Sequence, residues 1–271
     1  SSAASDVYKR QILVLRTEHQ LSVDLRRKVA LFCNVEPDAV IQSIDVPSIY
    51  EVPLKMQEQK LDEIVLRKTG MEIGPRPELK PWREFLAHMQ NAKDTVRIGL
   101  VGKYVELQDA YKSINEALFQ AATYNNRKLD LQYIHSEKLT ESNVEEKLSS
   151  MDGLIIAPGF GQRGVEGKFV ALKYAREHDM PTFGICLGMQ CMVIEYARDV
   201  LGYKDANSTE MDVNTPHNVI DLMESQKCIS NMGGTMRLGE YDCILQEGSK
   251  AEQAYGKTHI CLLYTSPSPR D

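Results

Sequence analysis

The 271-residue sequence contains no uninterrupted apolar run of about 18 residues, the length that a membrane-spanning helix requires. We therefore expect no transmembrane helix and no membrane partner. Positive charge is also scarce, because the formal net charge is −6. That balance argues against a surface that binds a nucleic acid polymer, while it leaves room for local basic pockets that hold phosphates.

Paired cysteine motifs are absent as well. The six cysteines are residues 33, 186, 191, 228, 243 and 261, and no two of them have C-x-x-C or zinc-ligand spacing. We predict no metal site in this chain. The start of the sequence has no secretory pattern, so we expect reduced thiols and a cytoplasmic protein.

Both ends of the sequence differ from what lies between them. Residues 1–11 are small and polar, and residues 261–271 follow "KTHI" without structural periodicity. We interpret both as non-native tails that flank an internal piece of a longer protein.

From residue 96 onward, strand-like apolar runs alternate with stretches of helical spacing, as in "VRIGLVGKY", "AYKSINEALFQAATY" and "LDLQYIH". Strands separated by helices of roughly 10 to 15 residues indicate crossover connections and a parallel, doubly wound α/β sheet. We assign residues 96–260 to one domain with this fold. Ligands in such sheets bind beyond the carboxyl ends of the strands.

An earlier α/β segment covers residues 12–70. It contains a strand at 12–17, a helix at 23–33 capped by Ser22, a strand at 39–46 and one amphipathic helix that ends at Gly70. Residues 71–95 hold three prolines within seven residues and a short helical stretch, which is typical of an interdomain linker.

The stretch "PTFGICLGMQCM" places Cys186 between Gly184 and Gly188, where an apolar strand meets a helical pattern. G-x-C-x-G is the pattern of a nucleophile elbow, in which a tight turn lifts the reactive atom above the sheet. The helix that follows favours a thiolate at its N-terminus, and the N–H of Leu187 is placed to stabilise an oxyanion. Cys191 lies inside the helix, and we interpret it as a core residue.

A second glycine-rich stretch, "APGFGQRG" at 157–164, also follows a buried strand. Its glycines can free backbone N–H groups for an anion, although a flexible βα loop is an equally good interpretation of the pattern. A cysteine nucleophile normally needs a histidine base, and the pattern selects none of the six histidines.

At these residues the sequence resembles the class I (triad) glutamine amidotransferases, and among them the CTP synthase family. The resemblance rests on "GFGQRGVEGK", "GICLGMQCMVIEYARDV", "DANSTE" and "GGTMRLG", and upstream on "RRKVALFCNVEPDAVIQSIDVPSIYEVP". It implies a glutaminase domain of the class I amidotransferase type at 96–260, preceded by the C-terminal part of an amidoligase (synthetase) domain at 12–70.

The resemblance implies a role for each matching residue. Cys186 would form a glutamyl thioester, and glutamine would be held by Gly159, Leu187, Gly188, Met189, Gln190 and Glu210. Lys28 would contact the UTP or CTP phosphates, and Ile44, Asp45 and Val46 would contact ATP. Thr235 and Arg237 would belong to the surface where the activator GTP acts. The whole protein would use Mg²⁺ and ATP, with none of these bound to the glutaminase part, and would be a homotetramer.

The family takes its catalytic histidine and glutamate from an "H-P-E" segment, which this sequence does not contain. We therefore expect the chain to be inactive alone. Two alternatives stay open at this point: a glutaminase that serves another synthetase, and a regulatory or assembly protein with an amidotransferase fold.

Overall fold

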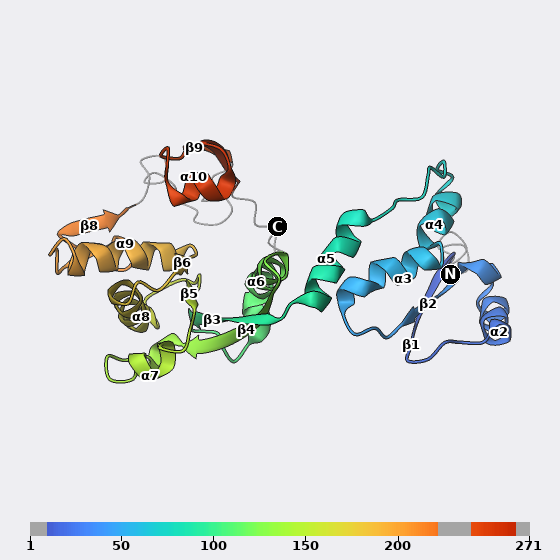
Figure 1. Cartoon of the computed structure of the whole chain (residues 1–271), viewed down its shortest axis with the longest axis horizontal. Coiled ribbons are helices and arrows are strands. Elements are labelled where there is room, and N and C mark those ends of the chain that lie inside the picture. The colour runs from blue at the N-terminus through green and yellow to red at the C-terminus, as the bar shows by residue number, and fades with distance from the viewer. Residues whose placement is uncertain (1–9, 222–239, 264–271) are drawn as a thin grey trace, which may run out of the picture. The chain divides into compact units, whose positions relative to one another are not determined.

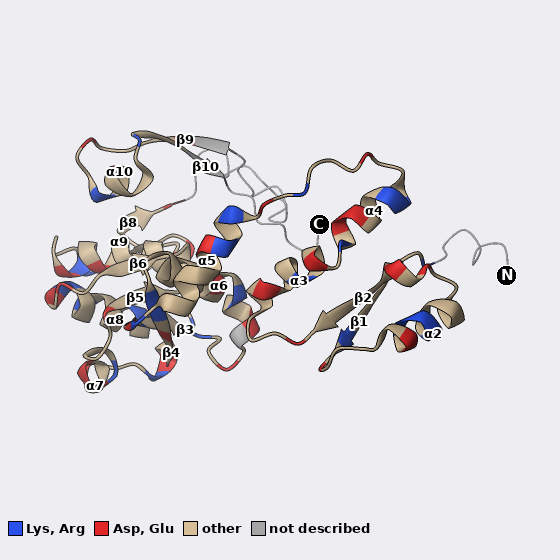
Figure 2. Ribbon diagram, turned by 45° about the vertical axis from the view of Figure 1, so that its right-hand side comes forward, with Lys and Arg blue, Asp and Glu red and all other residues tan. Residues whose placement is uncertain are grey.

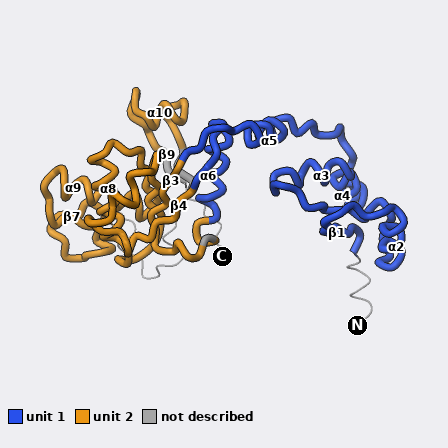
Figure 3. The backbone as a smooth tube through the Cα atoms, turned by 60° about the horizontal axis from the view of Figure 1, so that its bottom comes forward, with its two compact units in different colours: residues 1–96, 112–130 blue, residues 97–111, 131–271 orange. Residues whose placement is uncertain are grey.

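The computed structural model describes residues 10–221 and 240–263 (Figure 1). The chain divides into two compact units (Figure 3). Unit 1 consists of residues 1–96 and 112–130, and unit 2 consists of residues 97–111 and 131–271.

Unit 1 begins with a parallel pair of strands, β1 (Leu13–Thr17) and β2 (Val40–Ile44). Helix α2 (Val23–Cys33) connects them, as predicted. Its N-cap is Ser22, whose hydroxyl oxygen accepts a hydrogen bond from the N–H of Leu25 at 3.2 Å. This bond satisfies one of the N–H groups that the first turn of a helix leaves unpaired.

The prediction of a single helix that ends at Gly70 is wrong, because the structure has two helices in this segment. Helix α3 covers Val52–Glu58 and helix α4 covers Leu61–Thr69. Lys60 adopts a left-handed conformation with φ 61° and separates them. The side chain of Gln59 bonds to the backbone of β2: its amide nitrogen donates to Gln42 O at 2.6 Å, and its oxygen accepts from Gln42 N at 2.8 Å.

Helix α4 carries acidic residues in its first turn and basic residues in its last turn (Figure 2). Asp62 and Glu63 lie at the start, and Arg67 and Lys68 lie at the end. Both placements complement the helix dipole, so local electrostatics support this short helix.

The segment expected to be a linker contains a full helix, α5 (Lys80–Asn91), which is longer than the short helical stretch predicted. Within unit 1, α5 contacts α6 (Lys112–Tyr124). The indole N–H of Trp82 donates to Tyr50 O at 2.7 Å, and the Tyr50 ring stacks on Phe119 with 5.4 Å between centroids. An aromatic cluster therefore holds these parts of unit 1 together.

A four-stranded sheet has the order β4-β3-β5-β6, with β5 parallel to both β3 and β6. The strands and the helices that alternate with them are β3 (Asp94–Gly102), β4 (Arg127–His135), α7 (Val144–Leu148), β5 (Gly153–Ile156), α8 (Val165–Glu177), β6 (Thr182–Gly184) and α9 (Leu187–Asp199). Strands β3 and β4 begin in residues of unit 1 and end in unit 2. The predicted α/β fold with a parallel sheet is confirmed.

The main core lies in unit 2. Its members are buried residues from these strands and helices, among them Val101, Leu148, Ile156, Leu172 and Ile194. Helices α8 and α9 pack closely against each other. The apolar residues of each helix thus face the sheet or the neighbouring helix.

Beyond α9 the sequence pattern predicted no element, and the structure has several short ones. They are β7 (Ala206–Ser208), β8 (His217–Ile220), β9 (Glu240–Ile244), α10 (Lys250–Tyr255) and β10 (His259–Leu263). Earlier in the chain the structure also contains the 3-10 helices Pro37–Ala39, Ile49–Glu51, Gln108–Tyr111 and Ser136–Lys138. β7 and β8 pair in parallel, and β9 and β10 pair as an antiparallel ladder. Across the described ranges, no helix is both long enough and apolar enough to cross a membrane.

Candidate functional site

Cys186 lies at the turn between β6 and α9, where it is the N-cap of the helix. Its backbone has φ 52° and ψ −112°, a conformation that costs a residue with a side chain about 1–3 kcal/mol. The residue is exposed. The strand-turn-helix context predicted from the sequence is therefore present, with the strained backbone typical of a nucleophile elbow.

The two glycines of G-x-C-x-G are required by space. A Cβ on Gly184 would lie 2.6 Å from the carbonyl carbon of Gly188, and a Cβ on Gly188 would lie 2.0 Å from the carbonyl oxygen of Ile156. Both obstacles are backbone atoms that cannot rotate away. Only glycine allows the helix to start this close to the strands.

The second glycine-rich stretch lies at the same edge of the sheet. β5 and β6 are parallel neighbours, and Ile185 N donates to Ile156 O at 3.0 Å directly before the elbow. A Cβ on Gly159 would lie 3.7 Å from Leu187 Cδ2. The loop that follows β5 therefore abuts the first turn of α9.

The residues expected to hold glutamine are distributed around this edge. Leu187 and Gly188 are buried, Met189 is exposed, and Gln190 is partly buried. The side-chain oxygen Oε1 of Gln190 is buried and accepts no hydrogen bond from the described part of the chain. A buried polar atom without a partner calls for an explanation, and a bound ligand is one such explanation.

Glu210 lies in the turn between β7 and β8, where its N–H donates to Ser208 Oγ at 3.1 Å. The side-chain amide of Gln162 donates to the carbonyl oxygen of Met211. Because Gln162 belongs to the loop after β5, this bond ties the Glu210 turn to the same loop. The Glu210 side chain is exposed.

Two buried lysines donate hydrogen bonds to this loop, and neither was predicted from the sequence. Lys168 of α8 is 1% exposed and donates to Ala157 O at 2.7 Å. Lys103, just after β3, is 5% exposed and donates to Phe160 O. Desolvation by burial lowers the pKa of Lys168. The helical spacing of the sequence could have indicated that Lys168 is buried, because Lys168 shares a helix face with the buried Leu172 and Ala175.

Cys191 is buried, whereas Cys186 is exposed. It is fully buried within α9, and burial raises the pKa of its thiol to about 11. It is a core residue, as its position in the helical pattern predicted. A thiol with this pKa stays protonated near neutral pH and is a poor nucleophile.

Among the residues that the structure describes, no histidine makes a hydrogen bond or an ion pair with Cys186. His178 caps α8 and stacks on Tyr174, with 4.0 Å between the ring centroids. His217 opens β8, stacks on Tyr203 and bonds to Asp205 at 2.7 Å.

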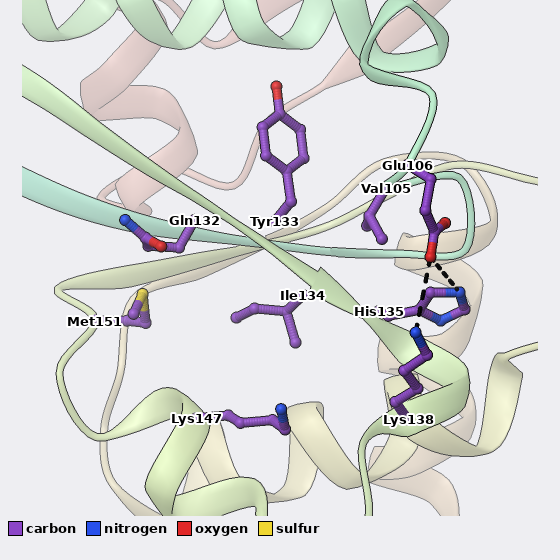
Figure 4. Close-up of a pocket in the computed structure, with 9 residues that line it drawn as sticks. All are labelled: Val105, Glu106, Gln132, Tyr133, Ile134, His135, Lys138, Lys147 and Met151. Carbon is purple, nitrogen blue, oxygen red and sulfur yellow. Dashed lines mark ion pairs between the residues drawn. The ribbon is translucent and has the colours of Figure 1, made fainter.

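His135 belongs to a separate cavity in unit 2 (Figure 4). Its Nε2 lies 3.5 Å from Glu106, which also lies 3.8 Å from the ammonium of Lys138. Its Nδ1 accepts from the N–H of Glu137 at 3.3 Å. These contacts occupy both ring nitrogens.

In unit 1, Ile44, Asp45 and Val46 line one cavity. Arg26 and Lys55, which were not predicted from the sequence, line it as well. The Nε of Arg26 is buried and donates to no acceptor within the described residues.

The other expected nucleotide-binding residue that the structure describes is not part of that cavity. Lys28 is exposed on α2 and is not among its lining residues. Thr235 and Arg237 lie outside the described residues. Among the described residues, no group of three or more His, Cys, Asp or Glu side chains is placed to hold a metal ion.

Comparison with known proteins shows the family of this chain. The family model "Glutamine amidotransferase class-I" matches residues 106–268, which is more than half of the chain. The chain therefore belongs to the class-I glutamine amidotransferase family.

A second model, "CTP synthase N-terminus", matches residues 6–71. The chain is 66% identical to the CTP synthase of Porphyromonas gingivalis over 249 residues, which cover 92% of the chain and 46% of that protein. It is 65% identical to the CTP synthase of Bacteroides fragilis, with 92% and 47% covered. Within its family the chain is thus similar to CTP synthases, and it spans about half the length of these curated relatives.

A solved structure shows the same fold. The glutaminase domain of Trypanosoma brucei CTPS with bound acivicin superposes with a TM-score of 0.57 at 36% identity. The match covers 62% of this chain and 65% of the other.

Proposed function

We propose that this chain carries the glutamine-hydrolysing site of a CTP synthase and that Cys186 is its nucleophile. The observation that carries the proposal is the turn at Cys186, with φ 52° on a residue that has a side chain and glycines pressed against backbone on both sides. Such strain persists where the surrounding structure enforces it, and here it exposes a sulfur at the N-terminus of a helix.

The proposed reaction starts from the Cys186 thiolate. The sulfur attacks the carboxamide carbon of glutamine, the C–N bond breaks, and the amide nitrogen leaves as ammonia after it accepts a proton. A water molecule then attacks the glutamyl thioester and releases glutamate and the free cysteine. The reaction needs a histidine and a glutamate partner, and we propose that both come from residues beyond this sequence.

The surroundings of Cys186 support a role in binding glutamine. The N–H groups of Leu187 and Gly159 donate to no acceptor in the part of the chain that the structure describes, so they are available to an oxyanion. The unpaired Oε1 of Gln190 suits a substrate N–H, and the carboxylate of Glu210 suits the α-ammonium of glutamine. Gly188 and Met189 complete the proposed binding set.

The ammonia would serve the synthetase part of the whole protein. In this proposal ATP phosphorylates O4 of UTP, and ammonia displaces the phosphate to give CTP. We assign the nucleotide to the cavity in unit 1, because Arg26 and Lys55 line it together with Ile44, Asp45 and Val46 and can supply positive charge to a phosphate, although the Lys55 ammonium also pairs with Glu58 of the same lining at 3.1 Å.

The remaining parts of the proposal rest on the similarity to CTP synthases. They are contacts between Lys28 and the UTP or CTP phosphates, activation by GTP at a surface that includes Thr235 and Arg237, Mg²⁺ with the ATP, a homotetrameric whole protein and a cytoplasmic location.

Covalent labelling of the chain tests the nucleophile. We expect 6-diazo-5-oxo-L-norleucine, an electrophilic analogue of glutamine, to add once to the parent chain at pH 8, with the adduct mapped to Cys186 by peptide mass spectrometry. Cys186→Ala should show no adduct. Cys191→Ala is the matched control and should label like the parent, because the Cys191 thiol has a pKa of about 11. An adduct that persists in Cys186→Ala would contradict the assignment.

A further inference from the structure

The loop that faces Cys186 is held from behind by two ammonium groups. Lys168 comes from α8, and Lys103 comes from the chain just after β3. Their hydrogen bonds end on two carbonyl oxygens of the same loop, those of Ala157 and Phe160. The two bonded positions enclose Pro158 and Gly159.

Burial makes this arrangement costly for the fold. Lys168 is 1% exposed and Lys103 is 5% exposed, so each charge has lost nearly all of its water. A methionine would fill a similar volume without that desolvation cost. Lys168 forms no salt bridge within the described residues, and its only side-chain hydrogen bond there is the one to Ala157 O. Stability of the core alone therefore does not account for a lysine at this position.

The positions of the bonded carbonyls give the lysines another role. A carbonyl drawn toward the lysines leaves the N–H groups of the intervening peptides free to face elsewhere. The N–H of Gly159 has no acceptor in the described part of the chain, and Gly159 lies beside Leu187 at the start of α9. Gly159 is also close to Lys103, whose Cε would lie 3.3 Å from an added Cβ. The loop is thus confined between Lys103 on one side and the elbow on the other.

Charge adds to this geometry. Lys168 interacts electrostatically with Cys186, Cys191 and Lys103. Two positive charges close to the unpaired N–H of Gly159 favour negative charge next to that N–H, where the proposed oxyanion would develop.

We propose that Lys168 and Lys103 are positioning residues that fix the backbone of residues 157–160 for glutamine binding and oxyanion stabilisation at Cys186. The proposal rests on the proposed function of Cys186. Neither lysine touches the reacting atoms; each acts through the loop carbonyl to which it donates.

The test compares three single variants of the full 271-residue chain. Lys168→Met and Lys103→Met each remove one hydrogen bond to the loop. Lys173→Met is the matched control, because Lys173 lies on the same helix as Lys168 but pairs with Glu141 at the surface. Lys103→Arg tests whether another cationic donor rescues the loss.

Two labelling reagents separate positioning from general damage. We expect Lys168→Met and Lys103→Met to slow labelling of Cys186 by 6-diazo-5-oxo-L-norleucine about tenfold or more, since small displacements at a reactive site have effects of that size. Iodoacetamide needs no glutamine pocket, so its rate at Cys186 should change little. Lys173→Met should match the parent with both reagents, and Lys103→Arg should recover most of the rate.

Hydrogen exchange measures the loop itself. Amide exchange in peptides that cover residues 157–161 should be faster in Lys168→Met and Lys103→Met than in Lys173→Met, while the melting temperature of Lys168→Met stays the same or rises. Unchanged exchange in both loop variants, together with parent-like labelling by the glutamine analogue, would overturn the inference. A parent chain that reacts with iodoacetamide but not with the glutamine analogue would instead overturn the proposed function, and the exchange data would still decide whether the lysines hold the loop.

Discussion

Unit 2 and the amino-terminal segment of unit 1 bury apolar side chains on very different scales. The core of unit 2 draws on strands β3, β4 and β5 and on helices α7 to α9, and its centre includes Leu148, Ile156 and Ile194, each with 0% exposure. In the described part of the segment around β1 and β2, the cluster consists of the buried residues Ala39, Ile41 and Ile64, with Ile12, Met56 and Leu61 partly buried against them.

The amino-terminal segment also leaves large apolar side chains in solvent. Leu31 is 80% exposed and Phe32 is 88% exposed on α2. Small structures bury a smaller share of their surface and are correspondingly less stable. Unit 2 has exposed apolar side chains too, such as Phe160 and Phe183, so the difference lies in the size of the core. The candidate glutaminase site stands on the larger core, whereas the segment similar to the N-terminal part of CTP synthases has a sparser one.

The largest effect should come from the elbow in unit 2. Gly188→Ala places a Cβ 2.0 Å from Ile156 O, and we expect a loss of about 3 kcal/mol or more in the free energy of unfolding. The measurement is urea denaturation followed by circular dichroism.

Gly202→Ala is the matched control for that experiment. It has a left-handed backbone with φ 81° but nothing within 4 Å of an added Cβ, so only backbone strain of about 1 kcal/mol is expected. Equal losses in the two variants would show that the close approach of α9 to β5 does not limit stability.

The two cores can be compared directly by truncating one isoleucine in each. Ile194→Ala should cost about 3–4 kcal/mol, and Ile64→Ala about 2 kcal/mol, because a cavity in the smaller cluster can collapse more readily. The single tryptophan, Trp82, lies in unit 1, so its fluorescence reports unit 1 while circular dichroism reports both units. We expect Ile64→Ala to shift the fluorescence transition and Ile194→Ala to shift mainly the dichroism. If the fluorescence and dichroism transitions shift together in both variants, the expectation that the two units unfold separately is contradicted.

The smallest effect is expected at a helix cap. Ser22→Ala removes the acceptor for Leu25 N and should destabilise unit 1 by about 1 kcal/mol, seen as a lower urea midpoint of Trp82 fluorescence. Ser249→Ala removes an equivalent cap from α10 in unit 2 and should leave that midpoint unchanged. A fluorescence shift of the same size in both variants would mean that Trp82 does not report unit 1 alone.

The sequence predicted most of the elements between residues 96 and 199, because the apolar period there changes clearly between strands and helices and glycines mark the turns. The elbow followed from the same signals. Two helices were misjudged for physical reasons. Lys60 interrupts the helix at 52–70 because Gln59 is bound to β2, a contact between segments that periodicity does not record. Pro81 was interpreted as part of a linker, but it lies in the first turn of α5, where proline needs no hydrogen-bond donor.

The site was predicted less completely than the fold. Residues next to Cys186 followed from the motif, whereas Lys103 and Lys168 were missed because a lysine within an apolar pattern usually extends its ammonium into water. The cavity in unit 1 was half predicted: Ile44 to Val46 were chosen on resemblance, and Arg26 is recognised only once α2 is placed beside β2. The strands after residue 200 are too short to show a period.

The contact between Gln59 and Gln42 has a consequence for association with other chains. The free edge of a β-sheet exposes N–H and C=O groups that can recruit a strand from another molecule, which is a common route to aggregation. At Gln42 both groups on the side of β2 away from β1 are bound by one side-chain amide, which occupies the place of a neighbouring strand. The break in the helix that brings Gln59 to this position thereby closes β2 to edge-to-edge pairing at its centre.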